Sequence, residues 1–229
     1  MNKAIITIMT LVLVVGVCNV NAADKVFTES GEILEGEVWD FVDIYNDDTV
    51  VDMLGGIADY ITTHDWSTLN VTGGSAEFGA IDYSTINISG GSHSAAITWE
   101  YGTVSLSGDA ELDGVGIGDF GTINMTGGSL GNLLGRESGV LNLHGGTISN
   151  LLSVNDLSIA NIFGYNLFKK SSGGDYGYGY VSGFWLDDTP FTIDLYDAET
   201  YSHVNLVPEP CTLCLLGMGI LIIRKRLRK

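Results

Sequence analysis

The chain has 229 residues, a formal net charge of -18 and 45% hydrophobic residues, which is enough apolar content for a folded core. Between Ala23 and Val207 the only basic residues are Lys25, Arg136 and the pair Lys169 and Lys170. A body this acidic repels nucleic-acid phosphates and anionic lipid surfaces. We therefore exclude nucleic-acid binding.

Residues 1–22 have the pattern of a secretory signal. Lys3 supplies a positive start, residues 5–17 are almost entirely apolar, and Val20, Asn21 and Ala22 precede the expected cut. We expect a signal helix here and cleavage by signal peptidase between Ala22 and Ala23. All three cysteines lie in the apolar segments at the two ends of the chain, so the exported body must fold without disulfides.

A repeat occupies the middle of the chain, in which a short β-prone run ends in Gly-Gly or Gly-Asp. The first glycine of each pair recurs every 17 to 19 residues, at Gly55, Gly73, Gly90, Gly108, Gly127 and Gly145. A unit this short cannot bury its own apolar face, so successive units must stack. The sequence predicts an all-β fold, a single-chain parallel β-solenoid (β-helix) of six to seven turns over residues 49–164.

Alternation within each copy predicts which side chains face inward. The inward set is Val51, Met53, Leu69, Val71, Ile86, Ile88, Val104, Leu106, Ile123, Met125, Leu141 and Leu143. The residues between them form an outward column of threonine and asparagine, with Asn70, Asn87, Asn124 and Asn142 as possible contacts for a polysaccharide. The alternative is that this column only makes the outside of the solenoid polar.

We expect caps on both ends of the stack, because terminal repeats are atypical. The acidic segment 23–48 is the expected N-terminal cap. Residues 165–207 are the expected β-rich C-terminal cap, with a hairpin that turns at 187–190 and a last strand over 203–207.

The last part of the chain, 208–229, contains an apolar run of 13 residues, 211–223, followed by the basic cluster 224–229. This run predicts a short transmembrane helix, since a full span takes about 20 helical residues. The basic cluster should stay on the cytoplasmic side, which places the body outside.

Pro208, Glu209 and Pro210, the short apolar helix and the terminal basic cluster together resemble the PEP-CTERM sorting tail. The resemblance covers about the last 23 residues and implies that these three residues are the sorting motif, read by an exosortase-type processing enzyme. It also implies an exported protein associated with a biofilm or exopolysaccharide matrix. Cys211 and Cys214 stand where small or hydroxyl residues are more usual in that family.

Other chemistry is less well supported. Cys211 and Cys214 have the spacing of a redox pair but lie in an apolar run, and the four histidines lack metal-ligand spacing, so we expect them at surface or turn positions. The sequence predicts no cofactor, although calcium could bind oxygen ligands in two acidic runs. These are Asp40, Asp43, Asp47 and Asp48 in the first, and Asp187 and Asp188 in the second.

We expect an exported, non-enzymatic structural or adhesive protein of the cell surface or extracellular matrix, held by a C-terminal membrane anchor that could be cleaved. Two alternatives stay open. One is a glycan-binding module that uses the outward column. The other is a β-helix polysaccharide lyase or hydrolase, for which Asp109, Glu111, Asp113 and Asp119 would be the acidic candidates.

Overall fold

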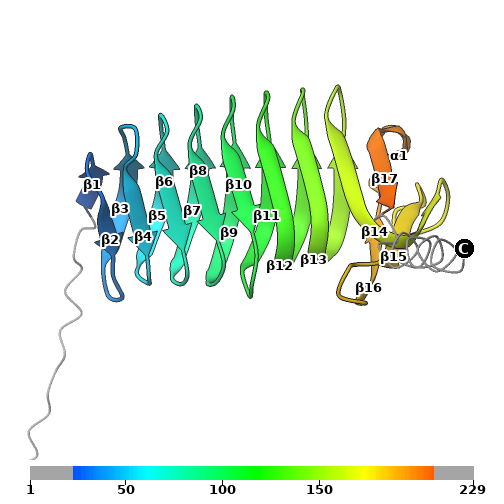
Figure 1. Cartoon of the computed structure of the whole chain (residues 1–229), viewed down its shortest axis with the longest axis horizontal. Helices are drawn as coiled ribbons and strands as arrows, with labels where there is room; N and C mark the ends of the chain where they lie inside the picture. Colours follow the sequence, from blue (N-terminus) through cyan, green and yellow to red (C-terminus); the bar gives the residue numbers. More distant parts are fainter. Residues whose placement is uncertain (1–22, 209–229) are drawn as a thin grey trace, which may run out of the picture.

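The computed structural model describes residues 23–208, which form an all-β parallel solenoid of about eight turns. Figure 1 shows the turns side by side along the long axis, and the chain advances by one turn at a time from the blue end to the yellow end. Each turn consists of two strands joined by two corners, so the solenoid has two parallel sheets with the core between them.

The first sheet carries the predicted repeat. Its strands are β2 (Gly31–Ile33), β4 (Val50–Met53), β6 (Thr68–Val71), β8 (Thr85–Ile88), β10 (Thr103–Leu106), the first halves of β12 (Thr122–Gly135), β13 (Val140–Val154) and β14 (Ile159–Lys170), and finally β17 (Val204–Pro208). All neighbouring pairs are parallel, so equivalent residues of successive turns form columns along the axis.

The second sheet is built from the less regular halves of the repeats. It contains β1 (Ala23–Phe27), β3 (Val38–Ile44), β5 (Ile57–Thr63), β7 (Ser75–Ala80), β9 (Ser92–Thr98), β11 (Glu111–Ile117) and the second halves of β12 and β13. Its pairs are also parallel, and several contain a shift in register.

The predicted inward columns are confirmed. All twelve residues, from Val51 and Met53 to Leu141 and Leu143, are at most 1% exposed. Ile61, Phe78 and Leu133 meet them from the second sheet and are fully buried. Burial of these columns is the main source of stability, because residues 23–208 contain no cysteine that could form a disulfide.

In most turns, the corner that leads from the first sheet to the second is formed by the Gly-Gly or Gly-Asp pair, and we call it the glycine corner. The second glycine usually has positive φ, as at Gly74 with φ +85°. A Cβ atom on Gly74 would lie 2.6 Å from the carbonyl oxygen of Gly56 in the preceding turn. Glycine is therefore required there by both the backbone conformation and the close approach of two turns.

The segment 23–48, predicted as a cap, forms β1, β2 and β3, which pair in parallel with the strands that follow. The stack therefore has about eight turns where we expected six to seven. This segment has only one positive-φ glycine, Gly36, and lacks a Gly-Gly pair. Its sequence therefore does not show the signal that predicts the glycine corner in the later turns.

The C-terminal end combines an antiparallel hairpin with one more parallel strand. β15 (Tyr180–Phe184) and β16 (Pro190–Asp194) form the hairpin, and the helix α1 (Ala198–His203) leads into β17. Trp185, only 3% exposed, stacks on Phe191 at 3.8 Å and donates from Nε1 to the carbonyl oxygen of Gly146. The hairpin is thereby packed against the solenoid.

The predicted signal helix, Ala22, and the tail from Glu209 onward, including the expected transmembrane helix 211–223, lie outside the described residues. Ala23, on the other side of the expected cut, is the first residue of β1. Within residues 23–208, no helix has the length and apolar character needed to cross a membrane.

Candidate functional site

The structure brings the four candidate asparagines into one column on the outside of the first sheet. Asn87 pairs with Asn70, and Asn124 with Asn142, in the strand register. Their side chains are half-buried and bond to one another: Asn87 Nδ2 donates to Asn70 Oδ1 at 3.0 Å, and Asn142 Nδ2 to Asn124 Oδ1 at 3.0 Å.

This asparagine column extends beyond the predicted residues. Asn70 donates to Asp52 at 2.8 Å, Asn161 donates to Asn142 at 3.0 Å, and Asn205 donates to Asn161 at 3.2 Å. Ser105 separates the two runs. Amide groups that already bond to each other along the axis offer fewer free donors and acceptors to a ligand.

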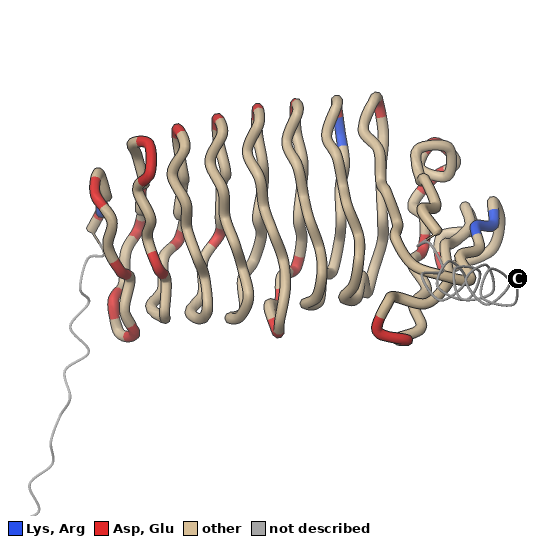
Figure 2. The backbone as a smooth tube through the Cα atoms, viewed as in Figure 1, with Lys and Arg blue, Asp and Glu red and all other residues tan. Residues whose placement is uncertain are grey.

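The second corner of each turn, which we call the acidic corner, carries a column of carboxylates that we did not predict from the sequence. It consists of Asp65, Asp82, Glu100, Asp119, Glu137 and Asp156, all with φ between 48° and 61°. Figure 2 shows acidic residues recurring at the tips of successive turns along this edge. The signal was present in the sequence, since these residues recur every 17 to 19 positions.

Most of these carboxylates bond to the preceding turn. Asp119 N donates to Glu137 Oε2 at 2.7 Å, Glu137 N donates to Asp156 Oδ2 at 3.2 Å, and Asp65 N donates to Asp82 Oδ2 at 3.3 Å. A residue in the left-handed conformation turns its amide away from the sheet ladder, and the carboxylate of the next turn satisfies that amide. The acidic corner is thus a structural device of the repeat.

Stacking acidic groups at successive turns also affects their protonation. The pKa of Glu100 is raised, first because of a side-chain hydrogen bond with Asp82 and then because of the negative charges of Asp82 and Asp119. Like charges at adjacent positions favour the neutral form of one partner.

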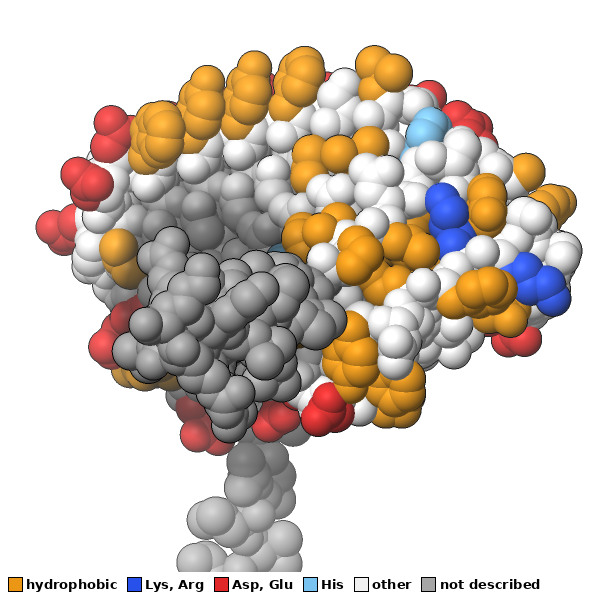
Figure 3. Space-filling model, turned by 45° about the vertical axis from the view of Figure 1, so that its right-hand side comes forward, with side chains coloured by type: hydrophobic (Ala, Val, Ile, Leu, Met, Phe, Trp, Pro, Cys, Tyr) orange, Lys and Arg blue, Asp and Glu red, His pale blue; other side chains and the backbone are white. Residues whose placement is uncertain are grey.

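Directly after four of the acidic residues stand aromatic side chains that stack along the axis. Trp66 and Tyr83 have ring centroids 4.6 Å apart, Tyr83 and Tyr101 4.9 Å, and Tyr101 and Phe120 5.4 Å, with nearly parallel planes. Figure 3 shows a row of hydrophobic side chains along one edge of the molecule. Because the rings face each other, the inner ones present their edges to solvent and not their faces.

The two acidic runs that we considered for calcium do not form a cluster. Within the described part of the chain, no group of three or more His, Cys, Asp or Glu residues is arranged to hold a metal ion. Asp187 accepts the Thr189 amide at 3.0 Å, which lowers the pKa of Asp187, while Asp188 accepts a hydrogen bond from the Tyr165 hydroxyl.

The expectation that every histidine lies at the surface or in a turn is wrong for His93, which is 3% exposed. Its Nδ1 accepts from the Ala76 amide at 3.3 Å, and its Nε2 lies 2.9 Å from the carbonyl oxygen of Gly90. These partners select the neutral tautomer with the proton on Nε2. Burial lowers the pKa of His93.

The four acidic residues considered for catalysis do not converge on one point. Glu111 and Asp113 line a polar groove of about 490 Å³ together with Ser92 and Ser129. Asp119 lies at the acidic corner, where its carboxylate accepts the Glu100 amide at 3.3 Å. Comparison of the chain with protein-family models, with curated proteins and with solved structures found no match.

Proposed function

We propose that the chain is a non-enzymatic structural or adhesive protein of the cell surface or extracellular matrix. On this proposal, segment 1–22 directs export and the tail 208–229 sorts the protein through Pro208, Glu209 and Pro210. The partners are signal peptidase, an exosortase-type processing enzyme and the membrane, with extracellular polysaccharide around the exported body.

The structural role is supported by the hydrogen bonds that the repeated polar side chains form between turns. The asparagine column and the acidic corner both bond mainly from turn to turn, as in the pairs Asn142 with Asn124 and Asp119 with Glu137. Side chains committed in this way stiffen a rod and leave few groups free for catalysis. The same observation weakens the alternative in which Asn70, Asn87, Asn124 and Asn142 bind a glycan directly.

Display on intact cells tests this proposal. An epitope inserted after Gly177, around which a Cβ atom would meet nothing within 4 Å, should be removed by protease added outside the cells. A full-length, tagged protein that stays soluble in the cytoplasm would contradict the proposal.

The sorting motif needs a separate test in a host that encodes an exosortase-type enzyme. Replacing Pro208, Glu209 and Pro210 by Ala should leave export intact but block processing, so that mass spectrometry finds residues 211–229 still attached. The control variant Glu35→Ala changes an exposed acidic residue in the described body and should be processed normally. Normal processing of the triple variant would remove the motif from the proposal.

A further inference from the structure

The strand β11 and the residue that follows it have an outer surface without side chains at three alternating positions. Gly114, Gly116 and Gly118 face outward, whereas Val115 and Ile117, between them, are at most 3% exposed and belong to the core. None of the three glycines has positive φ. The backbone conformation therefore does not require glycine at any of these positions.

Packing does not require these glycines either. A Cβ atom on Gly114 would come no closer than 3.8 Å to any atom, and one on Gly116 no closer than 3.9 Å, both ordinary contacts. Glycine inside a strand weakens it, because the flexible backbone loses more conformational entropy on folding and no side chain packs there. Glycine at these three outward positions therefore has no benefit for folding, and it leaves room for a ligand to approach the backbone.

The neighbouring turns form the walls of this bare strip, which we call the β11 trough. Ile97 and Trp99 lie on one side, and Leu134 and Arg136 lie on the other, in the same register as Gly116 and Gly118. The flanking backbones are about 10 Å apart, or two strand spacings. A groove of about 360 Å³ is lined by these residues and by Glu137.

The indole of Trp99 forms part of the trough wall and reaches both neighbouring turns. Its Cζ3 is 3.1 Å from where a Cβ atom of Gly79 would be, and its Cδ1 is 3.4 Å from the same point on Gly118. The indole therefore extends from the turn before Trp99 to the turn after it, and Trp99 is 36% exposed. Trp99 does not belong to the stack of rings at the acidic corner, which consists of Trp66, Tyr83, Tyr101 and Phe120.

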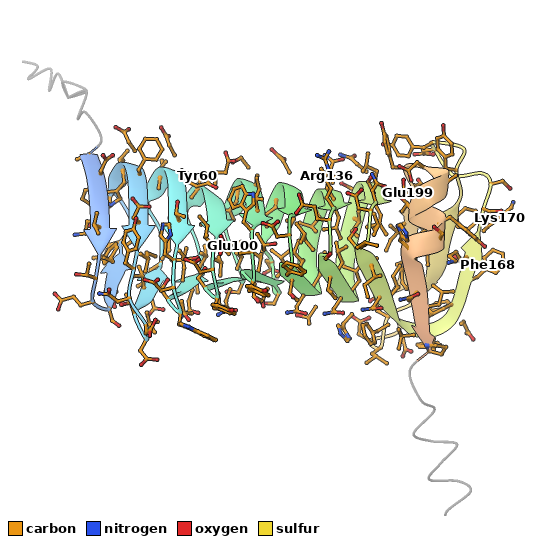
Figure 4. All side chains as sticks on the ribbon, turned by 90° about the horizontal axis from the view of Figure 1, so that it is seen from above. Tyr60, Glu100, Arg136, Phe168, Lys170 and Glu199 are labelled. Carbon is orange, nitrogen blue, oxygen red and sulfur yellow. The ribbon has the colours of Figure 1, made fainter. Side chains whose placement is uncertain are left out.

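A second groove lies at the other end of β11, next to this strip. Glu111 and Asp113 of this strand line it, with Ser129, Asn132 and Asn150 from the following turns. One end of the trough thus offers an aromatic face and a guanidinium group, and the other offers hydroxyl, amide and carboxylate groups. Figure 4 shows Arg136 on the same side of the solenoid as Tyr60, whose hydroxyl also lies over Gly79.

We propose that the β11 trough binds a neutral polysaccharide chain laid along the strand, with Trp99 as the stacking platform. The C–H face of a sugar ring fits the electron-rich face of an indole, and the guanidinium group of Arg136 can donate hydrogen bonds to neighbouring hydroxyls. The inference rests on the proposed function, because only an exported body meets such a polymer.

The charges around the trough select a neutral chain over an anionic one. Glu100, Asp119 and Glu137 of the acidic corner stand beside its aromatic end, and Glu111 and Asp113 stand at its polar end. Arg136 is the only basic residue of the solenoid between Lys25 and Lys169. One positive charge among five negative ones does not attract a polyanion.

Affinity electrophoresis of the full chain, kept in a polyoxyethylene detergent that contains no sugar, tests this proposal. The gels contain mixed-linkage β-glucan, galactomannan, dextran, soluble starch or alginate. We expect at least one of the four neutral polymers to retard the protein, and alginate to have no effect. Gly116→Val should keep the fold, since its Cβ has room, and should weaken retardation at least tenfold by filling the trough.

Ser105→Val is the matched control, because it adds the same side chain at an outward position on the opposite sheet and should bind as the unmodified protein does. Trp99→Ala is a second variant and should also weaken retardation at least tenfold. The proposal is overturned if no neutral polymer retards the protein, if only alginate does, or if Gly116→Val and Trp99→Ala bind unchanged. Binding by the purified chain does not depend on its location, so lost display with retained binding would count against the proposed function alone.

Discussion

The asparagine column makes a quantitative prediction about stability. Asn142 takes part in two hydrogen bonds of the column, as donor to Asn124 and as acceptor from Asn161, whereas Asn124 takes part in one. A typical hydrogen bond contributes about 1 kcal/mol net. Asn142→Ala should therefore lower the free energy of unfolding by about 2 kcal/mol, and Asn124→Ala by about 1 kcal/mol.

The variants Asn142→Ala and Asn124→Ala can be compared directly, because both residues lie at the same register position in adjacent turns. Ser105→Ala, in the same column but outside these bonds, supplies the baseline and should cost close to nothing. Urea unfolding followed by circular dichroism gives the three values, provided that the slope with urea is the same in each variant. Equal losses for Asn142→Ala and Asn124→Ala would refute the argument that the bonds along the column contribute separately.

Three further predictions concern the core, the glycine corner and pH. Phe78→Ala should cost about 3–5 kcal/mol in urea unfolding, because Phe78 is fully buried; a loss under 1 kcal/mol would contradict this. Gly74→Ala should destabilise by more than about 1 kcal/mol, since its φ is positive and its Cβ would meet Gly56, and unchanged stability would show that the corner can relax. The pKa of His93 is lowered in the folded state, so below about pH 6.5 the unfolded state takes up a proton that the folded state does not. The free energy of unfolding therefore decreases as the pH is lowered. His93→Gln should therefore lose less melting temperature between pH 7 and pH 5 than the unmodified protein, and equal losses would exclude His93 as the cause.

The regular part of the solenoid could be predicted from sequence because its signals are local. Pairs such as Ile86 with Ile88 alternate with polar residues, and the glycine pairs mark one corner of each turn, so the strands, faces and repeat length follow directly. The first turns lack that mark. Segment 23–48 has the single corner glycine Gly36 and many acidic residues, which made it resemble a cap.

The features that matter for a site depend on which turns are neighbours. Acidic residues at a surface carry no hydropathy signal, so the column from Asp65 to Asp156 was visible only as a spacing. The glycines of β11 can be read in the sequence, but Trp99 and Arg136 stand beside them only once the turns are in register. The sequence therefore shows that a strip of backbone is bare, and the register shows what borders it.

The turn-to-turn bonding of the two columns has a consequence for how such a protein can change in length over evolution. Each turn contacts mainly the turns before and after it, so a duplicated or lost repeat joins equivalent surfaces and keeps every column continuous. Half a repeat would instead place a glycine corner against an acidic corner and interrupt the columns. Changes in rod length are thus expected in steps of one whole turn, and any step placed away from β11 leaves the trough intact.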